Sequence, residues 1–197
     1  QTWRVAESIE QISPLAQLDP WFIEEPTHPD DTFGYKRIAE VVREHDILVA
    51  GGEHAASVVT FKNLLIAGAL DMVQIDASRV GGVNELIAEI LLAAQFDKPI
   101  CPHGGGIGLC GPISHLAIFD QIRVGGQRDD QVVEFLDFLQ GADTMVCGSS
   151  VHGSGAKKGR YAVPEQPGFS FEIQPDFVEK HTWSTGSVWA GRQNHFD

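Results

Sequence analysis

The chain has 197 residues, of which 43% are hydrophobic and 21% charged, a composition typical of a globular protein and not of a disordered one. Its formal net charge of −13 at pH 7 argues against nucleic acid and anionic membranes as partners, and no apolar run is as long as a membrane span. The three cysteines (Cys101, Cys110 and Cys147) form no CxxC pair, which argues against a disulfide framework and a zinc knuckle and favours a reducing, cytoplasmic location.

The first residues carry a helical pattern. Ala6, Ile9 and Ile12 recur at the spacing of one helix face soon after Gln1, so the chain is expected to begin inside a helix. This start, without an initiator Met, leads us to expect a fragment of a longer polypeptide.

Short apolar runs then alternate with amphipathic stretches. The runs predict β-strands at Trp21–Ile23, Ile47–Ala50, Met72–Ile75, Pro99–Cys101 and Ile118–Val124. Between the first four of them, apolar residues with helical period predict helices over Tyr35–Glu44, Ser57–Ala67 and Val83–Phe96, the last with Leu86, Ile90, Leu91 and Ala94 on one face. Helix starts are indicated by Asp30 and Asp31, by Ser57 and by Gly81-Gly82. Repeated units of this kind predict a parallel sheet with crossover helices.

Polar residues at the ends of the runs decide between two parallel-sheet architectures. Glu24, Glu53, Asp76 and His103 follow four successive runs. A TIM-like (β/α)-barrel gathers such positions around one axis, whereas a doubly wound sheet spreads them along a line and usually carries a Gly-rich phosphate loop, which is missing here. We therefore predict part of a (β/α)-barrel over residues 1–142, with about five of its eight strands.

The pattern breaks down after about residue 142. Arg160–Val163 and Phe169–Ile173 are candidates for short strands. We expect the segment 143–197 to pack on the outside of the barrel or on a capping domain.

Glu24 and Glu53 are candidate metal ligands. Buried carboxylates are unfavourable unless paired, and two of them one strand apart repel each other. A magnesium ion, which prefers oxygen ligands, would relieve that repulsion. The alternative is that one or both are ordinary salt-bridged or solvated carboxylates. Glu25, the next residue in the strand, is expected to point the opposite way and to support the site from behind.

Asp76 and His103 are a candidate acid–base pair. A carboxylate beside a histidine fixes its tautomer and raises its basicity, which suits a general base. The alternative is a structural histidine bonded to backbone. Cys101 and His103 are a further, less favoured, nucleophile pair. The glycine-rich stretch from His103 to Gly108 is read as a tight loop in preference to a phosphate-binding one.

These residues also carry a family resemblance. Trp21-Phe22-Ile23-Glu24-Glu25-Pro26-Thr27, Gly52-Glu53, Gln74-Ile75-Asp76 with Arg79 and Gly81-Gly82-Val83-Asn84-Glu85, and Cys101-Pro102-His103 with Gly108-Leu109-Cys110 together resemble the enolase superfamily. The mandelate racemase subgroup is most similar, and within it the L-fuconate dehydratases and related sugar-acid dehydratases. The resemblance implies an enolase-type (β/α)7β barrel of which this chain holds about strands four to eight, with the capping domain and first strands missing.

The resemblance also implies roles for single residues. Glu24 and Glu53 match Mg²⁺ ligands, Asp76 and His103 match the catalytic dyad, and Glu134 matches the eighth-strand acid that hydrogen-bonds the substrate carboxylate. The family's third metal carboxylate and an opposing lysine lie on earlier strands. Gly111 stands where the similar proteins have Glu.

The implied reaction is the magnesium-dependent dehydration of a sugar acid resembling L-fuconate, in which the α-proton is abstracted and the β-hydroxyl leaves to give a 2-keto-3-deoxy acid. A racemase or epimerase of the same superfamily and a non-catalytic partial barrel are the alternatives. We expect this segment alone to be inactive, and the resemblance implies homo-oligomers.

Overall fold

The computed structural model describes residues 1–104, 110–124, 132–134, 146–148, 163, 167–168 and 171–190. The chain divides into two compact units. The first comprises residues 1–105 and 112–134, and the second comprises residues 106–111 and 135–197. Within the described ranges, none of the helices is both long enough and apolar enough to cross a bilayer.

A parallel sheet forms the centre of the first unit. Its strands β1 (Phe22–Glu24), β2 (Leu48–Gly51) and β3 (Met72–Val73) lie in chain order, with Phe22 opposite Leu48 and Ala50 opposite Met72. The segment 99–101 extends the sheet through a parallel bridge between Val73 and Ile100. The first four predicted strand positions and their parallel direction are thus confirmed.

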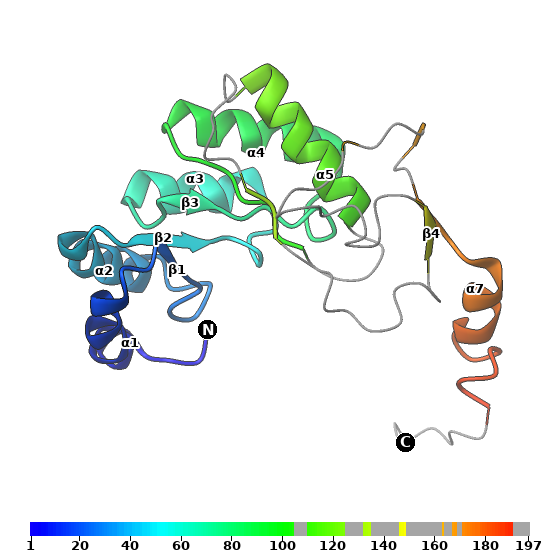
Figure 1. The fold of residues 1–197 in the computed structure, drawn as a ribbon, viewed down its shortest axis with the longest axis horizontal. Coiled ribbons are helices and arrows are strands. Elements are labelled where there is room, and N and C mark those ends of the chain that lie inside the picture. Colours follow the sequence, from blue (N-terminus) through cyan, green and yellow to red (C-terminus); the bar gives the residue numbers. More distant parts are fainter. Residues whose placement is uncertain are drawn as a thin grey trace. The chain divides into compact units, whose positions relative to one another are not determined.

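Helices follow β1, β2 and β3, as the apolar periodicity predicts, and a further helix, which was not predicted, follows the 99–101 segment. The helices of this unit are α1 (Val5–Ile12), α2 (Thr32–Val42), α3 (Val58–Ala67), α4 (Val83–Gln95) and α5 (Cys110–Phe119), with short turns η1 (Ser13–Leu18), η2 (Arg43–His45) and η3 (Asp120–Val124). Consecutive helices from α1 to α4 pack on each other, and Figure 1 shows α2, α3 and α4 following one another beside the strands that they connect. The first helix begins at Val5 and not at the chain start.

The predicted caps lie where the helices begin. The Asp31 carboxylate accepts a hydrogen bond from the Gly34 N–H at 2.8 Å, and the Ser57 hydroxyl accepts one from the Thr60 N–H at 3.4 Å. Both bonds satisfy N–H groups that have no partner inside the helix. Gly82 precedes α4 with a φ of 119°, a conformation that glycine adopts without strain.

Besides the helical chain start, two further local predictions are wrong. The run Ile118–Val124 is not a strand, because it forms the end of α5 and the π-helical turn η3. Ile113 and Leu116 in α5 and Asp120 in η3 are buried, and their spacing of three and four residues is helical. A short apolar run does not distinguish a buried strand from a buried helix.

The second correction concerns the inner face of α4. Leu86 and Ile90 are buried as expected, but Leu91 is 52% exposed and Ala94 is also exposed. Glu89 and Ala93 take their place in the core. The buried face is therefore rotated from the predicted one, and it includes a carboxylate.

The core consists of apolar clusters that join successive βα units. One cluster contains Tyr35, Ile38 and Leu70, and another contains Phe61, Val73, Ile75, Leu86, Ile90, Ile100 and Leu116. Burying one such side chain stabilises the fold by about 1.5–3 kcal/mol. Each βα unit therefore needs the next one to bury its apolar side chains. This packing holds the strand ends in a fixed register.

A cluster of charged side chains links successive βα units within the first compact unit. It lies at the end of the sheet where the strands begin. Asp71 directly precedes β3 and is 7% exposed. Its carboxylate accepts hydrogen bonds from Arg43 at 2.9 Å and from Lys98 at 3.0 Å. Burial acts to raise the pKa of Asp71, but these two cations and the Val49 N–H outweigh it and hold the pKa below its ordinary value. We call Arg43, Asp71 and Lys98 the basal clamp.

The described residues of the second unit include an antiparallel pair of strands and a helix. Strand β4 (Val146–Gly148) pairs antiparallel with β5 (Phe171–Ile173), and α7 (Pro175–His181) follows. The predicted strand at Phe169–Ile173 is confirmed over its last three residues, whereas β4 and α7 were not predicted. The candidate strand at Arg160–Val163 lies outside the described residues, apart from Val163.

Candidate active site

The ends of the parallel strands bring the predicted polar residues to one edge of the sheet. Backbone hydrogen bonds continue past the strands, because the His103 N–H donates to the Ile75 carbonyl at 3.0 Å and the Gln74 N–H donates to the Gly51 carbonyl at 2.9 Å. Parallel strands present their carboxyl ends on the same side. The backbone therefore places the residues that follow β2, β3 and the 99–101 segment beside each other.

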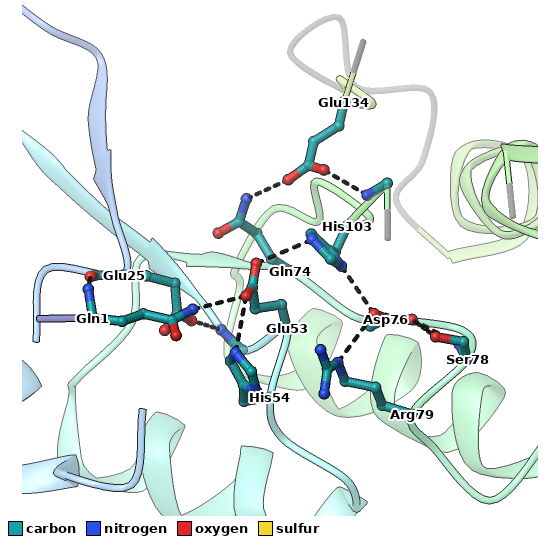
Figure 2. Close-up of polar contacts among 12 residues, drawn as sticks. Gln1, Glu25, Glu53, His54, Gln74, Asp76, Ser78, Arg79, His103 and Glu134 are labelled. Atoms are coloured by element: carbon teal, nitrogen blue, oxygen red, sulfur yellow. Dashed lines mark hydrogen bonds and ion pairs between the residues drawn. The ribbon is translucent and has the colours of Figure 1, made fainter. Parts of the chain in front are cut away.

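His103 lies between two carboxylates. Its Nδ1 is 2.9 Å from Oδ2 of Asp76, and its Nε2 is 3.0 Å from Oε2 of Glu53 (Figure 2). The ring is partly buried. The structure thus brings together three of the predicted site residues, which are contributed by three different loops.

Asp76 is fixed as an anion behind the histidine. It is 2% exposed, and its Oδ1 accepts hydrogen bonds from the backbone N–H and the hydroxyl of Ser78 at 2.7 and 2.6 Å. Arg79 Nε lies 3.3 Å from its Oδ2. Burial acts to raise the pKa of Asp76, but the bonds from Ser78 and His103 outweigh it and lower the pKa below its ordinary value. An anionic Asp76 accepts the Nδ1 proton of His103, which leaves Nε2 as the nitrogen that can gain or release a proton; in this structure Nε2 faces the Glu53 carboxylate, an arrangement that suits the protonated nitrogen.

Glu53 presents both of its oxygens to the site. Oε2 faces His103, and Oε1 lies 3.1 Å from Nε2 of His54 and accepts a hydrogen bond from the Gln1 amide at 2.7 Å. Glu24 ends the neighbouring strand β1 with an exposed side chain. Among the described residues, Glu24 makes no hydrogen bond or ion pair, so its carboxylate oxygens are available to a ligand.

Glu134 lies next to this group in the irregular segment 132–134, not in a described strand. Its carboxylate accepts a hydrogen bond from Gln74 Nε2 at 3.1 Å and another from the Gly104 N–H. Burial raises the pKa of Glu134, and the Glu24 and Glu53 carboxylates raise it further, against the opposing effects of Gly104 and His103. These effects favour the protonated form of Glu134 more than for an ordinary glutamate, and a protonated carboxyl group can donate a hydrogen bond.

The donor chemistry of this edge fits a hard divalent cation. Glu24 and Glu53 both act electrostatically on Glu134, so three carboxyl groups share a small region in which their charges repel. Carboxylate oxygens are the ligands that Mg²⁺ prefers. Over the described part of the chain, no group of three or more His, Cys, Asp or Glu side chains is arranged to hold an ion. The two glutamates thus fit as part of a coordination shell and not as a complete one.

The cysteine alternative finds no support. Cys101 is 3% exposed, and burial, followed by the Glu134 and Glu24 charges, raises the pKa of its thiol to about 12. A thiol with such a pKa holds almost no thiolate at neutral pH, and the thiolate is the nucleophile. The glycine-rich loop lies outside the described residues after Gly104, so its reading as a tight loop stays a prediction.

The prediction from sequence did not assign a role to Gln74. This side chain is fully buried, and within the described ranges its Oε1 has no hydrogen-bond partner. Gln74 precedes Asp76 by two residues, and alternate residues of a strand share a face. That spacing was the available signal that Gln74 points to the same side as Asp76.

The chain matches one protein family and is similar to several known proteins. A profile of the enolase C-terminal domain-like family matches residues 1–177. The chain is 39% identical over 192 residues to mitochondrial enolase superfamily member 1 of Homo sapiens, which covers 96% of this chain and 41% of the human protein. It is 40% identical over 183 residues to L-galactonate dehydratase of Hypocrea jecorina, which covers 93% of this chain and 39% of that protein.

Solved structures share the fold. The crystal structure of the human enolase superfamily member matches with a TM-score of 0.84 and 38% identity over 96% of this chain and 41% of that one. A racemase from Streptomyces coelicolor A3(2), whose crystal structure contains bound magnesium, matches with a TM-score of 0.54 and 28% identity over 67% of this chain and 36% of that one. The chain spans about two fifths of the length of the curated relatives that it matches.

Proposed function

Because the chain belongs to the enolase C-terminal domain-like family, we propose that the protein containing it is a magnesium-dependent dehydratase of a sugar acid. The reaction removes the proton α to the carboxylate and expels the β-hydroxyl, and the resulting enol becomes a 2-keto-3-deoxy acid. We propose L-fuconate or a close analogue as the substrate. The similarity to an L-galactonate dehydratase supports a substrate of this class.

The bonding of His103 is the observation that carries the proposal. Asp76 holds Nδ1 at 2.9 Å, and Nε2 points to the edge where Glu53 and Glu134 gather. Nε2 accepts the α-proton, and Asp76 stabilises the imidazolium that forms. The C–H electron pair then forms the carbon–carbon double bond as the β-hydroxyl leaves. His103 returns its proton to that hydroxyl, which departs as water.

The remaining acidic residues act on the charge that develops on the substrate carboxylate. Glu24 and Glu53 would hold the magnesium ion, which supplies positive charge to the enolate oxygens when bound. Glu134, whose pKa is raised by its burial and by its acidic neighbours, would in its protonated form donate a hydrogen bond to the same carboxylate. Both interactions strengthen as the oxygens become more negative, so they lower the barrier and not merely the energy of the bound substrate.

A racemase or epimerase is the second candidate. The similarity to the magnesium-containing Streptomyces racemase favours it, since both reactions begin with removal of an α-proton. The two reactions differ in the next step, where a racemase returns a proton to the opposite face instead of expelling a hydroxyl.

The test uses the protein that contains this chain, with Mg²⁺ and a panel of aldonic and aldaric acids. The measurement is formation of a 2-keto acid, and the control is His103→Asn, which removes the base but leaves a polar group beside Asp76. Product from L-fuconate or a close analogue, abolished in the variant, is the expected result. No product from any acid would refute the dehydratase. Solvent deuterium entering at the α-carbon would then identify a racemase, and no exchange would identify a non-catalytic barrel.

A further inference from the structure

Two consecutive glutamates at the end of β1 have opposite surroundings. Glu24 is exposed on the side of the site, whereas Glu25 is 6% exposed. Glu25 also has a φ of 45°, a left-handed conformation that is unfavourable for a residue with a Cβ. The strand therefore breaks directly after Glu24, and contacts made by Glu25 have to maintain that break.

Both oxygens of Glu25 are bonded. Oε2 accepts the hydroxyl proton of Tyr35, which is 1% exposed on α2, at 2.6 Å. Oε1 accepts the N–H of Gly52 at 2.8 Å. Gly52 is the residue before Glu53, and Figure 2 shows Glu25 beside the Glu53 turn. One buried carboxylate thus connects the end of β1, helix α2 and the turn that carries Glu53.

The Glu53 turn is shaped to admit this carboxylate. A Cβ on Gly51 would lie 2.8 Å from Oε1 of Glu25 and 3.1 Å from the Tyr35 ring. Gly52 has a φ of 119°, and a Cβ there would overlap the Phe61 ring. Both glycines are therefore required for the backbone to approach Glu25 and Phe61 so closely. This packing fixes the direction in which the chain enters Glu53.

We propose that Glu25 is a positioning residue that sets the relative placement of the two candidate magnesium ligands. It is joined to Glu24 by a peptide bond and to the Glu53 turn by the hydrogen bond from Gly52. This inference rests on the proposed function, because it assigns Glu24 and Glu53 to one ion. Without the Glu25 carboxylate, the backbone at residue 25 is free to leave its left-handed conformation, and the Gly52 N–H loses its hydrogen-bond partner. The two ligands then no longer share a fixed spacing.

The test measures magnesium binding directly, without substrate, by calorimetry on the protein that contains this chain. Outer residues that orient metal ligands typically contribute 10–100-fold to affinity, so Glu25→Ala should raise the Mg²⁺ dissociation constant by about that factor. Glu25→Gln should bind within about threefold of the wild type, because its carbonyl still accepts the Gly52 N–H and its amide can donate to the Tyr35 oxygen. Mg²⁺ affinity close to that of the wild type in Glu25→Gln would show that Glu25 acts through its hydrogen bonds and not through its negative charge.

A matched control separates positioning from lost stability. Asp71→Ala breaks the basal clamp at the other end of the strands, so it should lower the melting temperature and leave the Mg²⁺ dissociation constant unchanged. Equal binding by wild type and Glu25→Ala would overturn the inference, as would equal weakening by Asp71→Ala. If Glu25→Ala does not fold, Tyr35→Phe decides. It should raise the Mg²⁺ dissociation constant by about two- to tenfold, and an unchanged dissociation constant would overturn the inference. A wild-type protein that binds no Mg²⁺ would instead refute the proposed function, and the inference with it.

Discussion

The carboxyl group of Glu89 gives the protein a pH-dependent stability that can be measured. Glu89 lies on the inner face of α4 and is 1% exposed. Within the described ranges, neither of its oxygens has a hydrogen-bond partner. Burial, assisted by the nearby Glu85 carboxylate, raises the pKa of Glu89 from 4.5 to about 8. The folded protein therefore keeps a proton that the unfolded chain releases.

The sign and size of the effect follow from this difference in pKa. Between pH 4.5 and about 8 the folded state binds one more proton than the unfolded state, so stability falls as the pH rises through that window. Each unit of pKa difference corresponds to about 1.4 kcal/mol, so the whole window corresponds to about 5 kcal/mol. Below pH 4.5 and above about 8 this group contributes no further slope.

Glu89→Met removes the carboxyl group while keeping a side chain of similar length. We expect the variant to be more stable than the wild type by about 1 kcal/mol at pH 5 and by about 4 kcal/mol at pH 8. The assay is urea unfolding followed by circular dichroism at both pH values. Glu10→Met, an exposed position on α1, is the matched control and should leave the pH dependence unchanged. A difference between wild type and Glu89→Met that is the same at pH 5 and pH 8 would refute the reasoning.

Three further predictions concern the clamp, the site and the Glu53 turn. Asp71→Ala should lower the free energy of unfolding by about 2 kcal/mol in urea titrations at pH 7, because it leaves Arg43 and Lys98 without their carboxylate. Since the pKa of Asp71 is lowered, this loss should shrink as the pH falls below 3.8, and a constant loss would contradict the assignment. Gln74→Met removes the hydrogen bond to Glu134 and should reduce kcat/KM for the acid substrate about tenfold in steady-state kinetics; unchanged kinetics would exclude a role for Gln74. Gly52→Ala should cost at least about 2 kcal/mol in thermal unfolding, more than Gly68→Ala, which has the same sign of φ but open space around it; equal losses would show that the Phe61 contact is unimportant.

The repeating part of the fold could be predicted from sequence because local and tertiary signals agree there. Helices α2 and α3 bury the apolar residues that their periodicity places on one face, and the caps at Asp31 and Ser57 are local features. The wrong strand at Ile118–Val124 has a different origin. Its apolar residues are too few to define a period, and the helical conformation is set by the packing of Ile113 and Leu116 on the core.

The composition of the site was easier to predict than its bonding. A polar residue at the end of an apolar run is visible in the sequence, so Glu53, Asp76 and His103 could be named. The direction of each side chain depends on neighbours that are distant in the chain. The contact of Glu53 with His103 spans two successive βα units, and that of Glu134 with Gln74 spans 60 positions. The burial of Glu89 was not predicted, although it follows Leu86 by three residues, a spacing that places both on one helix face.

The basal clamp and the candidate active site occupy opposite ends of the same strands. Asp71 precedes β3 and Lys98 precedes the 99–101 segment, whereas Asp76 and His103 follow them. Residues that hold the units together are thus separate from residues that meet a substrate. Directed evolution can exploit this separation, because a library at Gln74, His54 and Ser78 leaves the clamp intact. Substitutions around the site therefore do not have to disturb the ion pairs that stabilise the sheet at its other end.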